Sequence, residues 1–213
     1  MNKWSVIIPV CLLNQDLKDK YEKAYTSIGP FVHEVIVIEN GSKELKQSDT
    51  IAWFKEPIGY AKAVNVGLAK ATGDFVLILN SDAVIDTWDW VSRLTMRFLS
   101  DEKIGVIIPY LKNDGEPNHT AQIVGPCWAL RREVLDKVGH LSVEYGAGYF
   151  DDNDYFMMTQ VASYKVVSEE GVKVTHAGQS TFKVLYTEDE IKKLSATNYD
   201  KFTNKWHRFP VLD

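Results

Sequence analysis

Polar or turn-forming residues follow three apolar runs that predict β-strands. They are residues 9–14, Glu39-Asn40 and Asn80-Ser81-Asp82. In an open α/β sheet, ligands bind beyond the carboxyl ends of the parallel strands, so we expect these groups to meet at one edge of the sheet. Asp82 has the carboxylate that Mg²⁺ or Mn²⁺ binds together with diphosphate oxygens, and Glu39 can accept a hydrogen bond from a base or a ribose. Taken one at a time, the same residues also fit polar turns that close strands.

A second group of candidate residues lies in the later half of the chain. Residues 151–154 read Asp-Asp-Asn-Asp at the start of a predicted helix, and His176 follows a predicted strand. A carboxylate in such a cluster can act as a general base. Acidic residues at a helix start also cap the helix and complement its dipole, and a half-buried histidine can simply bond the backbone. Trp128, Tyr149 and Tyr155 can stack on the ring of a ligand or pack in the core.

The elements that must position these residues alternate between strands and helices in the first half. Apolar runs predict strands at 6–9, 34–39, 51–54, 75–79 and 105–109, and helical spacing predicts helices at 17–28, 60–71 and 88–99. Gly73 is expected to stop the helix that precedes the fourth strand. This alternation predicts a largely parallel sheet with helices on both faces.

The second half is less regular, and we predict that it belongs to the same domain. The pattern predicts strands at 121–130, 164–168 and 172–175, helices at 132–138, 151 to about 162 and 188–205, and a Gly-rich loop at 145–149. No linker-like stretch and no internal repeat interrupts the sequence. We therefore expect a single domain over 1–213. Its first half would span about 1–109, its second half about 110–186 and its C-terminal helix about 188–207.

Composition excludes several classes of protein. The formal net charge of −5 argues against nucleic-acid binding, which normally needs a basic face. No apolar run approaches the roughly 20 residues of a transmembrane helix, and the first residues fit a strand better than a signal peptide. Cys11 and Cys127 have no metal-ligand spacing and do not suggest a disulfide scaffold. A reducing, cytoplasmic setting is therefore the expectation.

The order of the motifs along the chain resembles that of family-2 glycosyltransferases with the GT-A fold, over roughly residues 4–182. The motifs are Ser5-Val-Ile-Ile-Pro9, Glu34-Val-Ile-Val-Ile-Glu-Asn-Gly-Ser42, Gly59-Tyr-Ala-Lys-Ala-Val-Asn-Val-Gly67, Phe75-Val-Leu-Ile-Leu-Asn-Ser-Asp82, Gly125-Pro-Cys-Trp-Ala-Leu-Arg-Arg132, Phe150-Asp-Asp-Asn-Asp-Tyr155 and His176-Ala-Gly178. Each motif is weak alone, and their shared order and spacing carry the resemblance. It implies a single Rossmann-like α/β domain with a mainly parallel central mixed sheet flanked by helices. It also implies that the half over about 1–109 binds the nucleotide and the half over about 110–186 binds the acceptor.

The resemblance also implies which residues bind the nucleotide. They are Pro9, Val10, Cys11, Glu39, Asn40, Lys62, Asn80 and Ser81. The loop at 9–11 matches the one that cups the nucleoside, and Lys62 is a possible diphosphate contact. Glu39 stands where the family usually has an aspartate that faces the base. Asn80-Ser81-Asp82 matches the Asp-X-Asp motif with its first carboxylate replaced by an amide, which can still bond the ribose.

The remaining implied roles concern metal binding and proton transfer. Asp82 and His176 match the residues that hold the cation, Mn²⁺ or Mg²⁺, and an imidazole suits Mn²⁺ better. The family pattern Glu-Asp-X-Asp places the catalytic base at Asp152, with Asp151 in the place of the glutamate. The expected reaction is an inverting transfer of a sugar from a nucleoside diphosphate sugar to a hydroxyl of a glycan or glycoprotein acceptor.

Uridine diphosphate is the favoured nucleotide, because a carboxylate at Glu39 can accept from the N3–H of uracil. Thymine offers the same N3–H, so a dTDP-sugar is the next alternative. A dinucleotide-dependent oxidoreductase would need Gly-x-Gly-x-x-Gly after the first strand, where this chain has residues 10–14 without any glycine. A catalytically weak nucleotide-sugar-binding module of a larger multidomain protein remains open, given the amide at Asn80.

Overall fold

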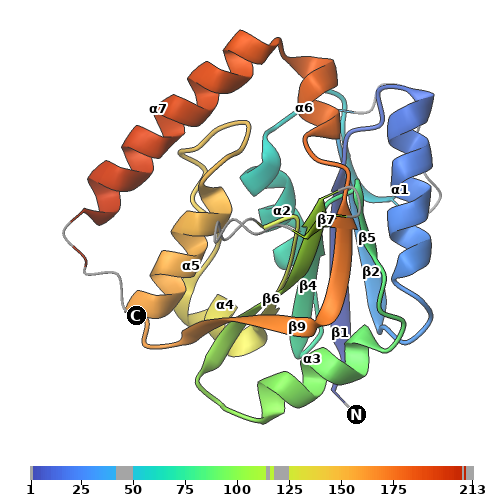
Figure 1. Cartoon of the computed structure of the whole chain (residues 1–213), viewed down its shortest axis with the longest axis vertical. Helices are drawn as coiled ribbons and strands as arrows, with labels where there is room; N and C mark the ends of the chain where they lie inside the picture. The colour runs from blue at the N-terminus through green and yellow to red at the C-terminus, as the bar shows by residue number, and fades with distance from the viewer. Residues whose placement is uncertain (1, 42–49, 114–115, 118–124, 208, 210–213) are drawn as a thin grey trace.

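The computed structural model describes residues 2–41, 50–113, 116–117, 125–207 and 209 of the 213-residue chain. The fold is built on one mixed sheet with the strand order β3-β2-β1-β4-β8-β6-β9-β5, and β7 pairs with β6 (Figure 1). The strands are β1 (Trp4–Val10), β2 (Glu34–Asn40), β3 (Thr50–Phe54), β4 (Phe75–Leu79), β5 (Ala83–Ile85), β6 (Ile104–Asn113), β7 (Glu116–Pro117), β8 (Cys127–Arg131) and β9 (Lys165–His176).

Parallel pairing dominates the first half of this sheet. The strands β3, β2, β1 and β4 pair in parallel with one another in that order, whereas β8 is antiparallel to both β4 and β6. Beyond β8, β9 is parallel to β6, and the short β5 is antiparallel to β9. This arrangement confirms the predicted mainly parallel mixed sheet.

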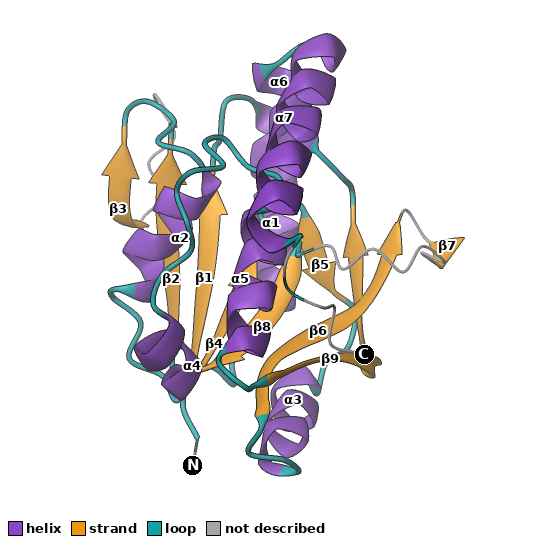
Figure 2. Cartoon of the chain, turned by 90° about the vertical axis from the view of Figure 1, so that its left-hand side faces the viewer, coloured by secondary structure: helices purple, strands orange, loops and turns teal. Residues whose placement is uncertain are grey.

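Helices cover both faces of the sheet (Figure 2). They are α1 (Gln15–Ser27), α2 (Tyr60–Leu68), α3 (Trp90–Leu99), α4 (Arg132–Val138), α5 (Asp151–Val161), α6 (Ser180–Leu185) and α7 (Glu188–Trp206). Side chains of α1 and α3 pack on one face, and those of α2, α4 and α5 pack on the other. None of the described helices combines the length and the apolar composition that a membrane crossing requires.

The central strands β1 and β4 are apolar except for Ser5, because both of their faces are covered. Every residue of β1 and of β4 is buried. Along β1, Val6 and Ile8 belong to the core on the α1 side, and Ile7 between them belongs to the core on the α2 side. Side chains therefore alternate between the two faces of the sheet along each strand. The same alternation determines the face on which a polar residue at the end of a strand lies.

The structure changes some predicted boundaries. The helix predicted at 60–71 ends at Leu68, before Gly73. The strands predicted at 164–168 and 172–175 are two halves of β9, because its pairing with β6 jumps from Glu169 to Lys173. The strand predicted at 121–130 is observed as β8, while residues 121–124 lie outside the described part of the chain. The elements β5 and α6 were not predicted.

Candidate active site

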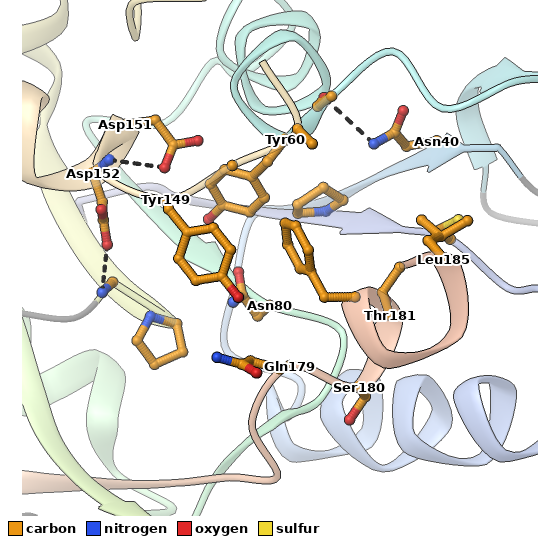
Figure 3. A pocket seen from close by; sticks show the side chains of 18 of the residues that line it. Asn40, Tyr60, Asn80, Tyr149, Asp151, Asp152, Gln179, Ser180, Thr181 and Leu185 are labelled. Atoms are coloured by element: carbon orange, nitrogen blue, oxygen red, sulfur yellow. Dashed lines mark hydrogen bonds between the residues drawn. The ribbon is translucent and has the colours of Figure 1, made fainter. Parts of the chain in front are cut away.

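A cavity of about 890 Å³ lies beyond the carboxyl ends of β1, β2 and β4. Most of the predicted site residues line it, namely Pro9, Val10, Cys11, Asn40, Asn80, Ser81, Asp82, Asp151, Asp152 and His176. The rest of its wall comes from loops at 57–60 and 146–150 and from α6 and α7, and Figure 3 shows several of these side chains. The fold therefore brings together residues that are as far apart in sequence as Pro9 and His176.

Two predicted residues lie outside the cavity lining. Glu39 is fully buried, and the alternation along β2 places it on the same face as the core residue Val37. It pairs with Val10 of β1, so its backbone lies directly beside the cavity wall. Lys62 is exposed on α2. Both remain candidates for nucleotide contact, but neither belongs to the surface that encloses the cavity.

The predicted metal ligands Asp82 and His176 are in contact. Ala83 of β5 pairs with His176 of β9, and this register places Asp82 beside the imidazole. His176 Nε2 lies 3.0 Å from Asp82 Oδ1, and the N–H of Ser180 donates to Asp82 Oδ2 at 3.2 Å. Burial alone would raise the pKa of Asp82, but the hydrogen bond and charge of His176 lower it below its ordinary value.

At this point the described part of the protein offers a cation two ligands, the carboxylate of Asp82 and the imidazole of His176. Within the described ranges, no three His, Cys, Asp or Glu side chains gather closely enough to hold a metal ion by themselves. Divalent cations in phosphate-binding sites commonly take one or two protein ligands and complete their shell with substrate phosphates and water. The pair Asp82 and His176 fits that kind of site, and its nitrogen ligand favours Mn²⁺ over Mg²⁺.

No lysine or arginine is found among the described residues that line the cavity. Its ionisable side chains include the carboxylates of Asp82, Asp151 and Asp152. Cys11 stays a neutral thiol, because burial raises its pKa to about 11. A diphosphate in this cavity therefore needs positive charge from a bound cation or from residues outside the described lining.

The amides at the strand ends have different surroundings. Asn40 accepts a hydrogen bond from the N–H of Ile58 at 2.7 Å and donates to the carbonyl of Gly59 at 3.4 Å, so it ties β2 to the loop at 57–60. The backbone N–H of Asn80 donates a hydrogen bond to the carbonyl of Pro126 at 2.7 Å. Its side-chain Oδ1 is buried and accepts no hydrogen bond from the described chain. Asn80 is thus available to a ligand, whereas the Asn40 side chain already serves the fold.

The acidic pair begins α5 at the opposite wall of the cavity. Asp152 Oδ2 accepts from the N–H of Gly125 at 2.7 Å, and Oδ1 accepts from the N–H of Asn153 at 2.8 Å. Any side chain at position 125 would collide with this carboxylate, because a Cβ there would lie 2.5 Å from Asp152 Oδ2. Burial raises the pKa of Asp152, although the two N–H donors oppose that shift.

Asp151 has a more apolar environment than its neighbour. It is 3% exposed, and Oδ1 accepts only a 3.2 Å hydrogen bond from the N–H of Asp152. Oδ2 is buried without a hydrogen-bond partner in the described chain. Burial, together with the charge of Asp152, raises the pKa of Asp151 to about 7. The pair therefore takes up and releases protons closer to neutral pH than ordinary aspartates do.

The third acid of the cluster has a structural role. Asp154 is fully buried and accepts from Tyr145 Oη at 3.1 Å, Trp206 Nε1 at 2.7 Å and Lys205 Nζ at 2.9 Å. These contacts join α5 to the end of α7, which Figure 1 shows beside α5 at the outside of the molecule. Sequence alone could not separate Asp154 from the pair that faces the cavity, because two of its three partners are more than 50 residues away, at the end of α7.

Aromatic side chains form the outer wall of the cavity. The ring centroids of Tyr149 and Phe182 lie 4.9 Å apart, and those of Phe182 and Tyr186 lie 5.6 Å apart. Of the three aromatics considered for sugar stacking, Tyr149 lines the cavity, whereas Trp128 and Tyr155 are fully buried in the core. Phe182 gave no signal in the sequence, since it lies on a helix that was not predicted.

Comparisons with known proteins agree with this architecture. Residues 5–132 match the family model described as Glycosyl transferase family 2. The mannosyltransferase PcManGT from Pyrobaculum calidifontis, solved with GDP-Man and Mn²⁺, superposes with a TM-score of 0.65 at 20% identity, covering 83% of this chain and 57% of that one. Glucosyl-3-phosphoglycerate synthase from Mycobacterium tuberculosis, solved with Mg²⁺ and uridine diphosphate, gives 0.60 at 17% identity, covering 86% and 74%. These likenesses confirm the predicted GT-A fold.

A curated relative extends well beyond the matched region. The uncharacterized protein y4gI of Sinorhizobium fredii is 24% identical over 193 residues, which cover 67% of this chain and 21% of the relative. The chain thus spans about a fifth of that protein and little more than half of the mannosyltransferase.

Proposed function

This chain belongs to glycosyl transferase family 2, and we propose that it transfers one sugar from a nucleoside diphosphate sugar to a hydroxyl of a glycan or glycoprotein acceptor. The observation that carries the proposal is the single cavity that joins the Asn80-Ser81-Asp82 turn to the acidic pair Asp151 and Asp152. One side of this cavity suits a diphosphate with its cation, and the other side supplies carboxylates for proton transfer.

The donor would lie along the strand ends. Pro9, Val10 and Cys11 would enclose the nucleoside, and Asn80 Oδ1 would accept from a ribose hydroxyl, which gives that buried atom a partner. We favour uridine diphosphate, with thymidine diphosphate next, because the acidic residue Glu39 lies beside this wall and can accept a hydrogen bond from the base. Solved relatives hold either GDP-Man or uridine diphosphate, so the fold itself accommodates both kinds of base.

Asp82 and His176 would hold the cation, Mn²⁺ in preference to Mg²⁺. When bound, the cation supplies positive charge to the diphosphate as it departs. The cavity lining supports this assignment, because its described residues offer no lysine or arginine for the same purpose. The solved relatives named above contain Mn²⁺ or Mg²⁺.

Asp152 would accept the proton of the acceptor hydroxyl as that oxygen attacks the anomeric carbon. Its two backbone hydrogen bonds orient the carboxylate, and each oxygen keeps a lone pair for the substrate. The raised pKa brings its basicity closer to that needed at neutral pH. A base that acts without a covalent intermediate gives inversion at the anomeric carbon, as in inverting glycosidases.

A second candidate is a catalytically weak nucleotide-sugar-binding module of a larger protein. The amide at Asn80, in place of the first carboxylate of the motif, favours it, as does the small share of the curated relative that the chain spans. Such a module would bind the donor at the same cavity and transfer its sugar slowly or not at all.

The deciding experiment follows release of the nucleoside diphosphate from a panel of sugar nucleotides in the presence of Mn²⁺, with and without a mixture of glycan acceptors. An enzyme releases diphosphate in catalytic amounts, and Asp152→Asn suppresses the release. Tight binding of a sugar nucleotide with no turnover under any condition would identify the binding module instead.

A further inference from the structure

Buried polar atoms without partners are concentrated in this cavity. Four side-chain atoms of this kind in the described part of the chain belong to residues that line it: Tyr60 Oη, Asn80 Oδ1, Tyr149 Oη and Asp151 Oδ2. The Trp128 indole acts on Tyr60 Oη as a hydrogen-bond donor, so it is the hydroxyl proton of Tyr60 that lacks an acceptor. Folded proteins rarely leave buried polar groups unpaired, so a cluster of them in one cavity indicates a ligand that pairs with them. Asn80 is assigned to the ribose above, which leaves two phenols and one carboxylate oxygen.

Tyr60 lies beside the acidic pair, and the Tyr149 hydroxyl points toward Asn80 and Gln179 (Figure 3). The charges of Asp151 and Asp152 act on the Tyr60 phenol, and the N–H of Tyr60 donates to the carbonyl of Ala147 in the loop that carries Tyr149. Gly59 makes this approach possible, because a Cβ there would collide with the Gly146 carbonyl. In Figure 3 the Tyr60 and Tyr149 rings lie between the acidic pair and Asn80.

The chemistry of these three groups matches a sugar ring. Burial raises the pKa of both Tyr149 and Tyr60, and the charges of Asp151 and Asp152 raise that of Tyr60 further, so both phenols stay protonated and donate hydrogen bonds. Asp151 Oδ2 can accept one. The packed rings of Tyr149 and Phe182 add an apolar surface for the C–H face of a sugar. A diphosphate fits poorly beside Tyr60, since the charges of two carboxylates act on that phenol.

The Tyr149 side chain is held in place by a strained backbone. Tyr149 and Phe150 have φ values of 66° and 70°, in the left-handed region that non-glycine residues seldom occupy. Asn198 of α7 donates to the Gly148 carbonyl at 2.8 Å and to the Tyr149 carbonyl at 3.4 Å, which secures this conformation. Strain that the surrounding structure maintains is typical of residues that position a ligand.

We propose that Tyr60 and Tyr149 donate hydrogen bonds to hydroxyl oxygens of the transferred sugar, while Asp151 accepts one from a third hydroxyl. This inference rests on the proposed function, because the sugar between the diphosphate at Asp82 and the base at Asp152 is the one being transferred. The subsite then selects a sugar with its full set of hydroxyls over deoxy analogues, since a missing hydroxyl leaves a buried donor or acceptor unpaired.

The test compares a nucleoside diphosphate with its sugar conjugate. Calorimetry in Mn²⁺ first identifies the tightest ligand among UDP-glucose, UDP-galactose, UDP-N-acetylglucosamine, dTDP-glucose and GDP-mannose. Tyr60→Phe and Tyr149→Phe are each then expected to weaken binding of that ligand by about three- to tenfold and to leave the affinity for the free diphosphate unchanged. Tyr164→Phe, at a tyrosine outside the cavity lining, is the matched control, and melting temperatures verify that each variant folds.

Deoxy analogues of the same sugar nucleotide locate the contact. Removal of one particular sugar hydroxyl should weaken binding of the sugar nucleotide to the wild type by a similar factor. The same removal should cause no further loss of affinity in Tyr60→Phe, as a double-mutant cycle requires for a direct pair. Equal losses for free diphosphate and conjugate, or no loss for either, would overturn the inference, as would a sugar that adds nothing to diphosphate affinity. Failure of the wild type to bind any of these nucleotides would instead overturn the proposed function.

Discussion

The side-chain amide of Asn198 donates a 2.8 Å hydrogen bond to the carbonyl oxygen of Gly148, across 50 residues of sequence. The same nitrogen also donates to the carbonyl of Tyr145 at 2.7 Å, and Asn198 is fully buried. Through these contacts α7, which lies outside the region matched by the family model, holds the loop that leads into the acidic pair.

Replacing this amide tests how far α7 supports the site. Asn198→Ala leaves two buried carbonyls without their donor, so we expect a loss of about 1–3 kcal/mol in the free energy of unfolding, measured in urea. Sugar transfer should fall by more than the loss of folded protein explains. Asn204→Ala, at an exposed position of the same helix, is the matched control. Unchanged stability in Asn198→Ala would mean that the loop does not depend on α7.

Removal of the Asp82 carboxylate tests the metal site. The wild type is expected to bind uridine diphosphate more tightly in Mn²⁺ than in chelator, because the cavity lining offers the diphosphate no described lysine or arginine. Asp82→Ala should abolish that gain, as followed by calorimetry. Asp89→Ala, at the residue that precedes α3 and outside the cavity lining, should keep it. Equal affinity of the wild type in Mn²⁺ and in chelator would remove the cation from donor binding.

Two neighbouring variants separate the base from its neighbour. Asp152→Asn keeps the shape of the side chain but removes its basicity, so transfer should fall by roughly 10²–10⁴-fold with little change in nucleotide affinity. Asp151→Asn retains a hydrogen-bonding group and should act mainly on the affinity for the sugar conjugate. Single-turnover rates and calorimetry measure the two effects. If Asp151→Asn abolishes transfer while Asp152→Asn does not, the base is Asp151.

Asp151 also predicts a pH dependence of stability. Its pKa is raised from 3.8 to about 7 in the folded protein, so the folded state retains a proton that the unfolded chain releases between these values. This contribution to stability is fully present below about pH 4 and is lost as the pH rises through about 7. Asp151→Asn should therefore gain stability relative to the wild type between pH 5 and pH 8 in urea titrations. The exposed Asp200→Asn should show no such relative gain.

Glu39 is the remaining test of base preference. Its backbone pairs with Val10 at the cavity wall, next to the residues assigned to the nucleoside. We expect Glu39→Ala to weaken the binding of uridine diphosphate more than that of guanosine diphosphate. Thermal unfolding checks that the variant folds. Wild-type ratios of the two affinities in this variant would show that another residue reads the base.

Sequence patterns were sufficient to predict the sheet and most of the strand-end residues. The apolar runs of β1, β2 and β4 are distinctive because these strands are buried on both faces, and ligand groups gather where such strands end. The short β5 has only three residues, too few for a periodic pattern, and it forms because β9 pairs with it. That pairing is what brings Asp82 to His176.

The remaining roles depend on tertiary contacts that no local pattern encodes. Asp154 follows the acidic pair by two residues, yet Trp206 and Lys205 draw it away from the cavity. The phenol of Tyr60 gives no signal in a chain with 12% aromatic residues, since only its surroundings in the cavity distinguish it from a core tyrosine. The face on which Glu39 lies could have been predicted from the sequence, because Glu39 follows Val37 by two residues in β2 and the two side chains therefore point to the same face.

The acidic lining of the cavity has a consequence for the order of events during turnover. A bare nucleotide anion that approaches Asp82, Asp151 and Asp152 meets charge of its own sign, which slows its association. The same anion that arrives as a complex with its cation has lost most of that charge and meets little repulsion. The donor is therefore expected to enter already chelated, and the diphosphate product to leave with its cation.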